Sequence, residues 1–299
     1  MLDPVSAAGA RNRTTSRSGN QPLLHVPERR QPMTNTTTAN SAGQTPVRIY
    51  TLDGGLTVFQ QGSIMSDTGE FQDRPVLMPT PAFLIQHGNR WLLWDTGNGD
   101  RIADLPGGSE LKFGGRFSVS RTLKDQLAEL GLDPDDIEFV ALSHLHQDHT
   151  GNVGLFPQAT FLVSAAELAF ARQIPTPFGI DGEATELLNR FKVDALDFDH
   201  DVFGDGSVTI LRAPGHTPGS LVLLVKLENS GAVLLSGDLF HLRENYEKQL
   251  VPVPNASRAD TLASFDRFAK IVANTNARVV VQHDPGDFAG MPTFPKYLD

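Results

Sequence analysis

The run His144-Leu145-His146-Gln147-Asp148-His149 places four potential metal ligands within six residues, directly after the short apolar segment 139–142. Imidazole and carboxylate groups suit zinc, iron, manganese and cobalt. In an extended or tightly turning segment, side chains two residues apart share a face. His144 and His146 can therefore converge on one metal, whereas Asp148 and His149 lie further round the turn and can reach a second.

A histidine-rich surface turn without a metal is the alternative interpretation of this run. The chain has nine histidines, and three of them fall in this hexapeptide beside an aspartate. A surface turn gives no reason for such crowding. Further His and Asp residues downstream also favour a metal site.

The downstream candidates share one pattern, because each follows a short apolar segment that reads as a strand. His216 follows 208–212, Asp238 follows 232–235 and His283 follows 279–281. Binding sites commonly gather where strand ends meet loops. A lone His after a strand is more often structural, but together the four segments supply seven N or O ligands, the number that two adjacent metals need. The strands and interspersed helices indicate a mixed α/β architecture.

Local patterns make further structural predictions. Asp53-Gly54-Gly55 between 47–52 and 56–60 predicts a β-hairpin, and 82–86 with 90–94 predicts a second one. Ser164 and Glu167 fit a capping box at the start of a helix. Asp95 follows a buried-type strand and either supports the site or satisfies the backbone of its own turn; the turn role is the one we favour.

Composition limits the function classes. The 299-residue chain has a net charge of −10, and phosphate binding needs a basic stripe, so we expect no nucleic-acid partner. No apolar run approaches the roughly 18 residues that span a bilayer. The absence of cysteine excludes disulfides and thiolate ligands. We expect a cytoplasmic protein that does not bind membranes.

The first 45 residues differ in composition from the rest of the chain. They are rich in Ser, Thr, Asn, Arg, Gly and Pro, and residues 1–32 carry five Arg against one Asp and one Glu. Such a segment cannot bury enough apolar surface to fold. We expect a disordered tail over 1–45, with Met33 as an alternative start, and a folded hydrolase domain over 46–299.

The motifs, taken together, resemble the metallo-β-lactamase superfamily. The matching residues are His144-x-His146-x-Asp148-His149, Pro214-Gly215-His216-Thr217-Pro218-Gly219, Ser236-Gly237-Asp238 and His283, with Asp95 matching a short upstream motif. The resemblance implies an αββα sandwich of two mixed β-sheets flanked by helices, with metals at one edge. It further implies that one metal is bound by His144, His146 and His216, a second by Asp148, His149 and His283, and that Asp238 bridges them.

Within the superfamily, the sequence is most similar to the N-acyl-homoserine lactonase family. The motifs Leu93-Trp94-Asp95-Thr96-Gly97 and Ser236-Gly237-Asp238-Leu239 carry this similarity, and 16 residues follow His283, which leaves no room for the helical domain of glyoxalase II. His149 stands where the best-known zinc β-lactamases have Arg. One position departs from many lactonases: His241 stands where they have the Tyr that contacts the substrate carbonyl.

The resemblance implies a dinuclear, metal-dependent hydrolase that opens a lactone ring, with an N-acyl-homoserine lactone as substrate and quorum quenching as the outcome. A hydroxide held between two divalent ions would attack the carbonyl, Asp148 would protonate the leaving oxygen, and His241 would either donate to the oxyanion or merely pack. We expect zinc, although iron, manganese and cobalt suit the same ligands. Dimers are common among such lactonases, and the sequence leaves the oligomeric state open.

Two alternatives share the expected ligands. An arylesterase or a phosphotriester hydrolase would use the same metals with a different pocket, and a regulatory metal-binding protein would need a partner surface that the sequence does not reveal. A lactonase needs an apolar cleft for the acyl chain. Candidates for this cleft, each of which could equally be core, are Met65, Phe71, Met78, Phe113, Phe117, Phe178 and Ile180.

Overall fold

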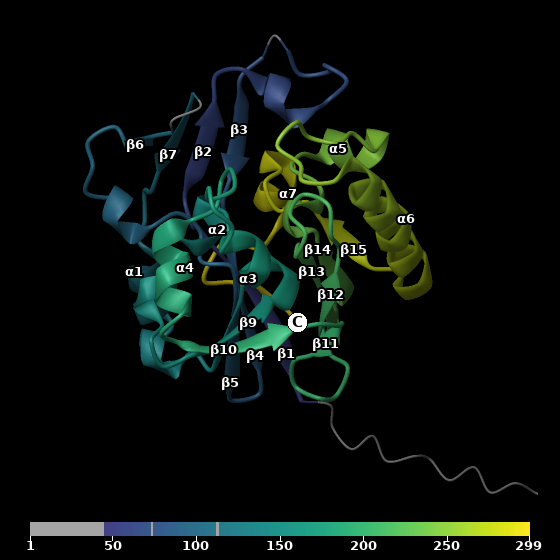
Figure 1. Cartoon of the computed structure of the whole chain (residues 1–299). Helices are drawn as coiled ribbons and strands as arrows, with labels where there is room; N and C mark the ends of the chain where they lie inside the picture. Colours follow the sequence, from purple (N-terminus) through teal and green to yellow (C-terminus); the bar gives the residue numbers. More distant parts are fainter. Residues whose placement is uncertain (1–44, 73, 112–113) are drawn as a thin grey trace, which may run out of the picture. The chain divides into compact units, whose positions relative to one another are not determined.

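Two β-sheets pack face to face, and helices cover the outer side of each (Figure 1). The computed structural model describes residues 45–72, 74–111 and 114–299. The tail predicted for 1–45 falls outside these ranges except for its last residue, and Phe113 also lies outside them. The αββα sandwich expected from the sequence is confirmed.

The larger sheet has seven strands in the order β10-β9-β8-β5-β4-β1-β16. Strands β5, β8, β9 and β10 are parallel, whereas β4, β1 and β16 pair antiparallel. The hairpin predicted at 82–94 is confirmed as β4 and β5. The bounds are β1 Val47–Leu52, β4 Ala82–His87, β5 Arg90–Trp94, β8 Phe139–Ala141, β9 Thr160–Ser164, β10 Lys192–Leu196 and β16 Tyr297–Leu298.

The second sheet has five strands in the order β11-β12-β13-β14-β15. All neighbours are antiparallel except β14 and β15, which run parallel. Strands β12, β14 and β15 therefore point the same way, and their carboxyl ends lie at the same edge. The bounds are β11 His200–Asp201, β12 Val208–Arg212, β13 Leu221–Leu227, β14 Gly231–Leu235 and β15 Arg278–Val280.

The main core lies between the two sheets. Side chains of a strand alternate between its faces, and on β1 Ile49 points to the inter-sheet core while Leu52 points to the helix side. Trp94 meets Leu223 and Leu235 of the second sheet in this core. Burying each such side chain stabilises the fold by about 1.5–3 kcal/mol, so the sandwich gives the site at its edge a rigid base.

Helices α1, α3 and α4 cover the larger sheet, and α6 covers the second sheet through Phe265 and Phe268 (Figure 1). Among the described residues, no helix is both long and apolar enough to cross a membrane. The α-helices are α1 Leu123–Glu129, α2 Gln147–Thr150, α3 Ala165–Ala171, α4 Gly182–Leu188, α5 Arg243–Lys248, α6 Arg258–Thr275 and α7 Pro285–Gly290. The 3₁₀ turns are η1 Gly62–Met65, η2 Asp100–Ile102, η3 Pro134–Asp136, η4 Val153–Leu155 and η5 Gly237–Leu239.

A third, four-stranded sheet, β3-β2-β7-β6, was not predicted. It contains β2, so the hairpin predicted around Asp53 is wrong: β1 pairs with β4 and β16, whereas β2 pairs with β3 and β7. Gln126 of α1 holds both backbone groups of Asp53, because its side chain accepts from Asp53 N at 2.8 Å and donates to Asp53 O at 2.8 Å. The chain is thereby directed from one sheet into another. The bounds are β2 Leu56–Phe59, β3 Val76–Pro79, β6 Ser109–Glu110 and β7 Gly115–Ser118.

Candidate metal centre

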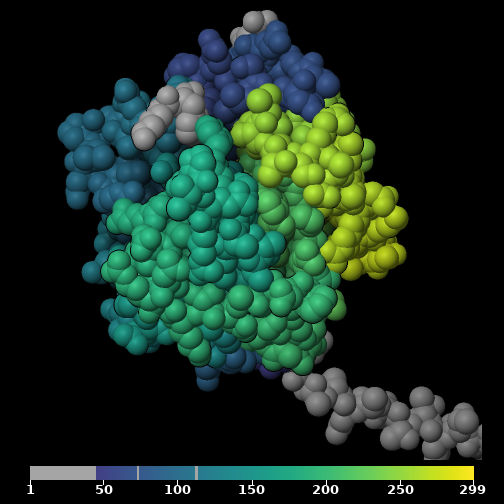
Figure 2. All heavy atoms as spheres, viewed as in Figure 1, coloured from purple at the N-terminus to yellow at the C-terminus, as the bar shows by residue number. Residues whose placement is uncertain are grey.

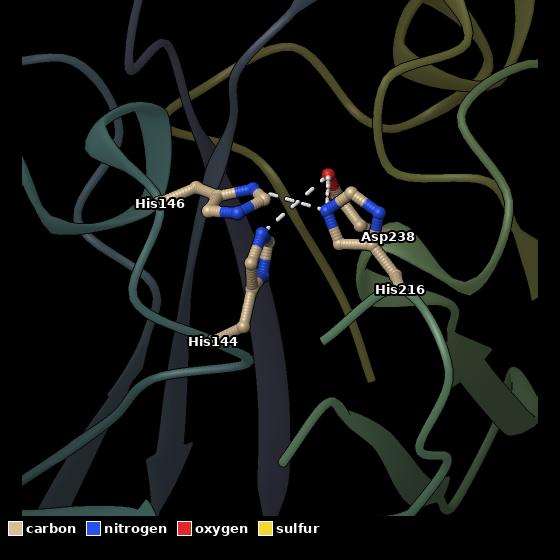
Figure 3. A group of neighbouring side chains, drawn as sticks. All are labelled: His144, His146, His216 and Asp238. Atoms are coloured by element: carbon tan, nitrogen blue, oxygen red, sulfur yellow. Dashed lines mark hydrogen bonds and ion pairs between the residues drawn. The ribbon is translucent and has the colours of Figure 1, made fainter. Parts of the chain in front are cut away.

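The structure brings all seven predicted ligands together from four separate segments. They form two groups, His144 with His146, His216 and Asp238, and Asp148 with His149 and His283; within each group the ligand atoms lie within 4.8 Å of one another. The first group is drawn in Figure 3. Each segment follows the carboxyl end of a strand, β8, β12, β14 or β15, as the sequence pattern predicted.

In the first group, three ring nitrogens face a common point (Figure 3). His144 uses Nδ1 to contact Ser143 Oγ at 3.0 Å, which leaves its buried Nε2 without a hydrogen-bond partner. His146 Nδ1 lies 3.0 Å from His216 Nε2. Asp238 Oδ2 lies 3.6 Å from His144 Nε2 and 3.5 Å from His216 Nε2.

In the second group, neighbouring acceptors determine which nitrogen of each ring carries the hydrogen. His283 Nδ1 lies 2.7 Å from the carbonyl oxygen of Pro79, which can only accept. His149 Nδ1 lies 2.9 Å from Asp95 Oδ2. Both rings therefore carry hydrogen on Nδ1, and the lone pairs of their Nε2 atoms, 3.1 Å apart, face each other.

This arrangement fits a bound cation. Asp238 Oδ1 lies 2.9 Å from His283 Nε2 and 3.1 Å from His149 Nε2, so three acceptor atoms converge on one point. A metal ion at this point would offset the repulsion between the three acceptors. Tetrahedral zinc with bonds of about 2.0–2.1 Å places its ligand atoms about 3.3 Å apart, close to the spacings found. Because Oδ1 faces one group and Oδ2 the other, Asp238 stands between two metal positions.

The electrostatics of the two groups differ. Burial lowers the pKa of His144 and His216 well below its ordinary value, and burial lowers the pKa of His146 to about 4. Burial acts in the same direction on His149 and His283, but Asp238 outweighs it and raises the pKa of both rings, with Asp95 adding to the effect at His149. The first group thus consists of neutral imidazoles, which are the form that binds metals.

Asp95 supports the centre, so the interpretation that it serves only its own turn is wrong. Its Oδ1 accepts from the backbone N–H of Ser143 at 2.7 Å, and its Oδ2 accepts from His149 and from Gln282 Nε2 at 2.7 Å. The residue has a φ of 57°, a left-handed conformation that is uncommon outside glycine. The chain accepts this strain where it brings the carboxylate beneath a ligand ring.

Glu167 is a supporting residue that the sequence reading assigned to another role. The Ser164 side chain makes no cap hydrogen bond, so the capping box is wrong. Instead, buried Glu167 accepts from the backbone N–H of Leu145 at 3.0 Å and of Gly219 at 3.1 Å. It ties the loop of His144 and His146 to the loop of His216. Gly219 is required here, because a Cβ at this position would lie 2.3 Å from Glu167 N.

A cavity of about 540 Å³ opens over the two groups. Chain segments from the first third (blue), the middle (teal) and the last quarter (yellow-green) border it and meet at the upper end of the face in Figure 2. His241 and Asp148 line it, and His241 Nε2 lies 3.3 Å from Asp238 Oδ2.

Four of the seven predicted cleft residues line this cavity: Met65, Met78, Phe117 and Phe178. Phe71 packs in a core cluster with Met65 and Met78, and Ile180 belongs to the core on the helix side of the larger sheet, so the core alternative holds for these two residues. Apolar lining residues that the sequence did not single out are Phe59, Ile64, Leu111, Phe170 and Val253. Several lie on or beside the unpredicted four-stranded sheet, which explains why they were missed.

Comparison with known proteins agrees with this geometry. The sequence model of the metallo-beta-lactamase superfamily matches residues 75–283. The N-acyl homoserine lactonase AttM of Azorhizobium caulinodans is 32% identical over 271 residues, which cover 85% of this chain and 100% of the relative.

Two solved structures share the fold. A variant of Bacillus thuringiensis AiiA with N-decanoyl-L-homoserine bound at its active site superimposes with a TM-score of 0.75 at 23% identity, covering 86% of this chain and 100% of that one. AidC, a dizinc quorum-quenching lactonase in complex with a product, gives 0.64 at 20% identity, covering 85% and 90%. The chain is a metal-dependent hydrolase with a dinuclear centre, and it belongs to the metallo-β-lactamase superfamily and, within it, to the family of the N-acyl homoserine lactonases.

Proposed function

We propose that this protein opens the lactone ring of N-acyl homoserine lactones and so destroys quorum-sensing signals. The observation that carries the proposal is the placement of Asp238 between two groups of metal ligands on the floor of a mainly apolar cavity. The family relationship supports the same substrate. AttM is named as an N-acyl homoserine lactonase, and the similarity to this chain extends over its whole length.

The assigned ligands follow from the two groups. His144, His146 and His216 would hold one ion, Asp148, His149 and His283 would hold the other, and Asp238 would bridge them. When bound, two adjacent divalent ions supply a nucleophilic water at neutral pH and polarise a carbonyl oxygen. Zinc is the ion we propose, because the neutral imidazole and carboxylate donors match its preferences.

Asp148 is proposed to donate a proton to the leaving group. Hydrolysis adds one water across the ring ester, so the departing ring oxygen must gain a proton. Asp148 lines the cavity, with Oδ1 3.8 Å from His149 Nε2 and Oδ2 3.9 Å from His283 Nε2. Its carboxylate therefore lies at the edge of the second group, where it can pass a proton to the ring oxygen.

His241 is proposed to stabilise the carbonyl oxygen. This oxygen gains negative charge when water adds to the carbonyl carbon, and a hydrogen-bond donor placed beside it lowers the barrier. His241 Nε2 lies beside the first group, next to Asp238 Oδ2, and the ring lines the cavity. An N–H at this position can donate to the oxygen.

The apolar wall is proposed to bind the acyl chain. Met65, Met78, Phe117 and Phe178 stand in a cavity whose volume is typical of sites for small molecules. Each methylene removed from water contributes about 0.8 kcal/mol. We therefore expect KM to fall as the acyl chain lengthens, until the cavity is filled.

The test is to assay the purified, zinc-loaded protein on N-acyl homoserine lactones of increasing chain length, on an aryl ester and on a phosphotriester. Lactone opening releases acid, which a pH indicator measures. The lactones should give the highest kcat/KM by at least tenfold, and a preference for either other substrate would overturn the proposal. Metal analysis of the same sample should find two ions per chain. A chain that starts at residue 45 should keep the activity if residues 46–299 form the hydrolase domain, and light scattering would show whether the protein is a homodimer.

A further inference from the structure

We infer that Trp94 and Gln282 form a hydrogen-bonded chain that fixes the orientation and tautomer of His149. This makes both of them positioning residues for the second metal position. The inference rests on the proposed role of His149 as a ligand. Neither residue lines the cavity, and their side chains hydrogen-bond to each other and to Asp95.

The series of hydrogen bonds begins at the indole of Trp94, the last residue of β5. Its Nε1 lies 3.1 Å from Gln282 Oε1. An indole N–H can only donate, so it assigns the amide oxygen of Gln282 to this side. The NH₂ group of Gln282 must then point the other way, which settles the orientation of an amide that could otherwise be turned by half a rotation.

The NH₂ group reaches Asp95. Gln282 Nε2 lies 2.7 Å from Asp95 Oδ2, and the same oxygen lies 2.9 Å from His149 Nδ1. The other oxygen accepts from the backbone N–H of Ser143. The amide of Gln282 and the backbone N–H of Ser143 can only donate, so both oxygens of Asp95 act as acceptors here. A hydrogen on His149 Nδ1 completes this set of donors, and the lone pair of Nε2 then faces the metal position.

Without these hydrogen bonds, His149 could carry its hydrogen on either ring nitrogen. Ser143 Oγ lies 3.2 Å from the same Nδ1, and a hydroxyl can donate as well as accept. A hydroxyl that donates to Nδ1 would place the ring hydrogen on Nε2, where it would block metal binding. The donor from Gln282 keeps Asp95 in place as an acceptor and so excludes this state.

Burial makes these hydrogen bonds hard to replace by hydrogen bonds to water. Trp94 and Asp95 are fully buried, and the exposed fractions of Gln282 and His149 are 1% each. Removal of the amide would leave a buried carboxylate short of a donor, and removal of the indole would leave the amide oxygen unpaired. Changes in the residues that orient a ligand typically weaken metal binding by about 10- to 100-fold.

The test compares the full-length variants Gln282→Leu and Trp94→Phe with the wild type by zinc titration against a competing chelator. We expect the affinity for one of the two ions to fall about 10- to 100-fold, with the other ion held as in the wild type. The double variant should be no weaker than Gln282→Leu, because Trp94 acts only through the amide. A matched control is Gln126→Leu, which removes another buried glutamine side chain, one that hydrogen-bonds to Asp53 and Thr122, and should leave both affinities unchanged.

A direct readout is the ¹⁵N chemical shift of the His149 ring in the zinc-loaded wild type, which reports the nitrogen that carries hydrogen even if a variant fails to fold. Hydrogen on Nδ1 supports the inference, and hydrogen on Nε2 overturns it. Unchanged affinities in both single variants, or an equal loss of both ions in them and in the control, would also overturn it. Failure of the proposed function would show separately, as wild-type protein that holds two ions and does not hydrolyse lactones.

Discussion

The metal centre has two halves: the first group is His144, His146, His216 and Asp238, and the second is Asp148, His149 and His283. The two halves are held in place by different means. In the first half, Glu167 accepts from backbone N–H groups of the two loops that carry the histidines, and from the Thr217 side chain, without touching a histidine ring. In the second half, Asp95 and the carbonyl oxygen of Pro79 bond directly to the rings of His149 and His283. A backbone clamp sets where a ligand lies, whereas a ring clamp also sets which nitrogen is free to bind. One centre therefore combines positional control with control of the tautomer.

The difference extends to charge. The first half has no carboxylate beyond Asp238 among its ligands, and its histidines have lowered pKa values because they are buried. The second half contains Asp148 and lies against Asp95, so its histidines are surrounded by negative charge. The second position is therefore the more negative one, and it suits a doubly charged ion even though its rings are fully buried.

The largest expected effect comes from the residue that belongs to both halves. Asp238→Ala removes both oxygens of the carboxylate that we propose bridges the two ions, so we expect hydrolysis to fall below detection and bound metal to drop from two ions per chain to one or none. His144→Ala should have a similar effect through the first half. Elemental analysis together with the lactone assay checks this, and metal-free protein that retains full activity would contradict the whole account.

Substitution of His241 should change the chemistry and leave the centre intact. Loss of one oxyanion donor typically lowers kcat by about 10²–10³-fold, and we expect a loss in this range for His241→Ala with both metals still bound. His241→Tyr restores a donor and should recover part of the rate. Equal rates for the wild type and His241→Ala would show that the ring only packs.

Substitution of Glu167 should weaken the first half and the fold together. Glu167→Ala leaves two buried N–H groups without partners, at a cost of about 2–6 kcal/mol in the free energy of unfolding. Glu167→Gln keeps one acceptor oxygen and should cost less. Chemical denaturation measures both, and zinc titration should show a weaker first position with the second little changed. Selective loss of the second ion would show that Glu167 supports the second half of the centre and not the first.

The same residue predicts a dependence on pH. Burial raises the pKa of the Glu167 carboxyl above its ordinary value, so its ionised form is disfavoured in the folded chain. As pH falls through the raised pKa, the folded wild type takes up a proton before the unfolded chain does. The stability of the wild type should therefore rise relative to Glu167→Gln as pH falls, until the ordinary pKa is passed. Chemical denaturation of both proteins at several pH values, after a chelator has removed their metal, would measure this difference in the free energy of unfolding.

The smallest expected effect belongs to Ser143, whose hydroxyl touches both halves. Its Oγ lies 3.0 Å from His144 Nδ1 and 3.2 Å from His149 Nδ1. One hydrogen bond of this kind contributes about 0.5–1.5 kcal/mol, so Ser143→Ala should weaken each metal position by about 2- to 10-fold. Titration that finds a large loss in one half alone would mean that the hydroxyl, and not the carboxylate clamp, controls that half.

The clustering of the seven assigned ligands could be predicted from sequence because each follows the end of an apolar strand, and the fold brings those ends to one edge. Their supports could not. Glu167 fits a capping box by its spacing, and its true partners lie in the loops at Leu145 and Gly219. The hairpin at Asp53 failed for a related reason, because Gln126, 73 residues away, directs that turn. Local patterns identify donors and acceptors, and the fold chooses between partners.

The four-stranded sheet supplies Thr57, Met78 and Phe117 to the cavity and none of the seven assigned ligands. Part of the proposed acyl-chain wall thus lies on strands that carry no assigned ligand. Strand β3 is an exception to this separation, because the carbonyl oxygen of its last residue, Pro79, accepts from His283 Nδ1. For a lineage exposed to changing signals, or for an engineer who wants a new specificity, the cavity-facing side chains of β2 and β7 are therefore the ones we expect to vary at least cost to the reaction.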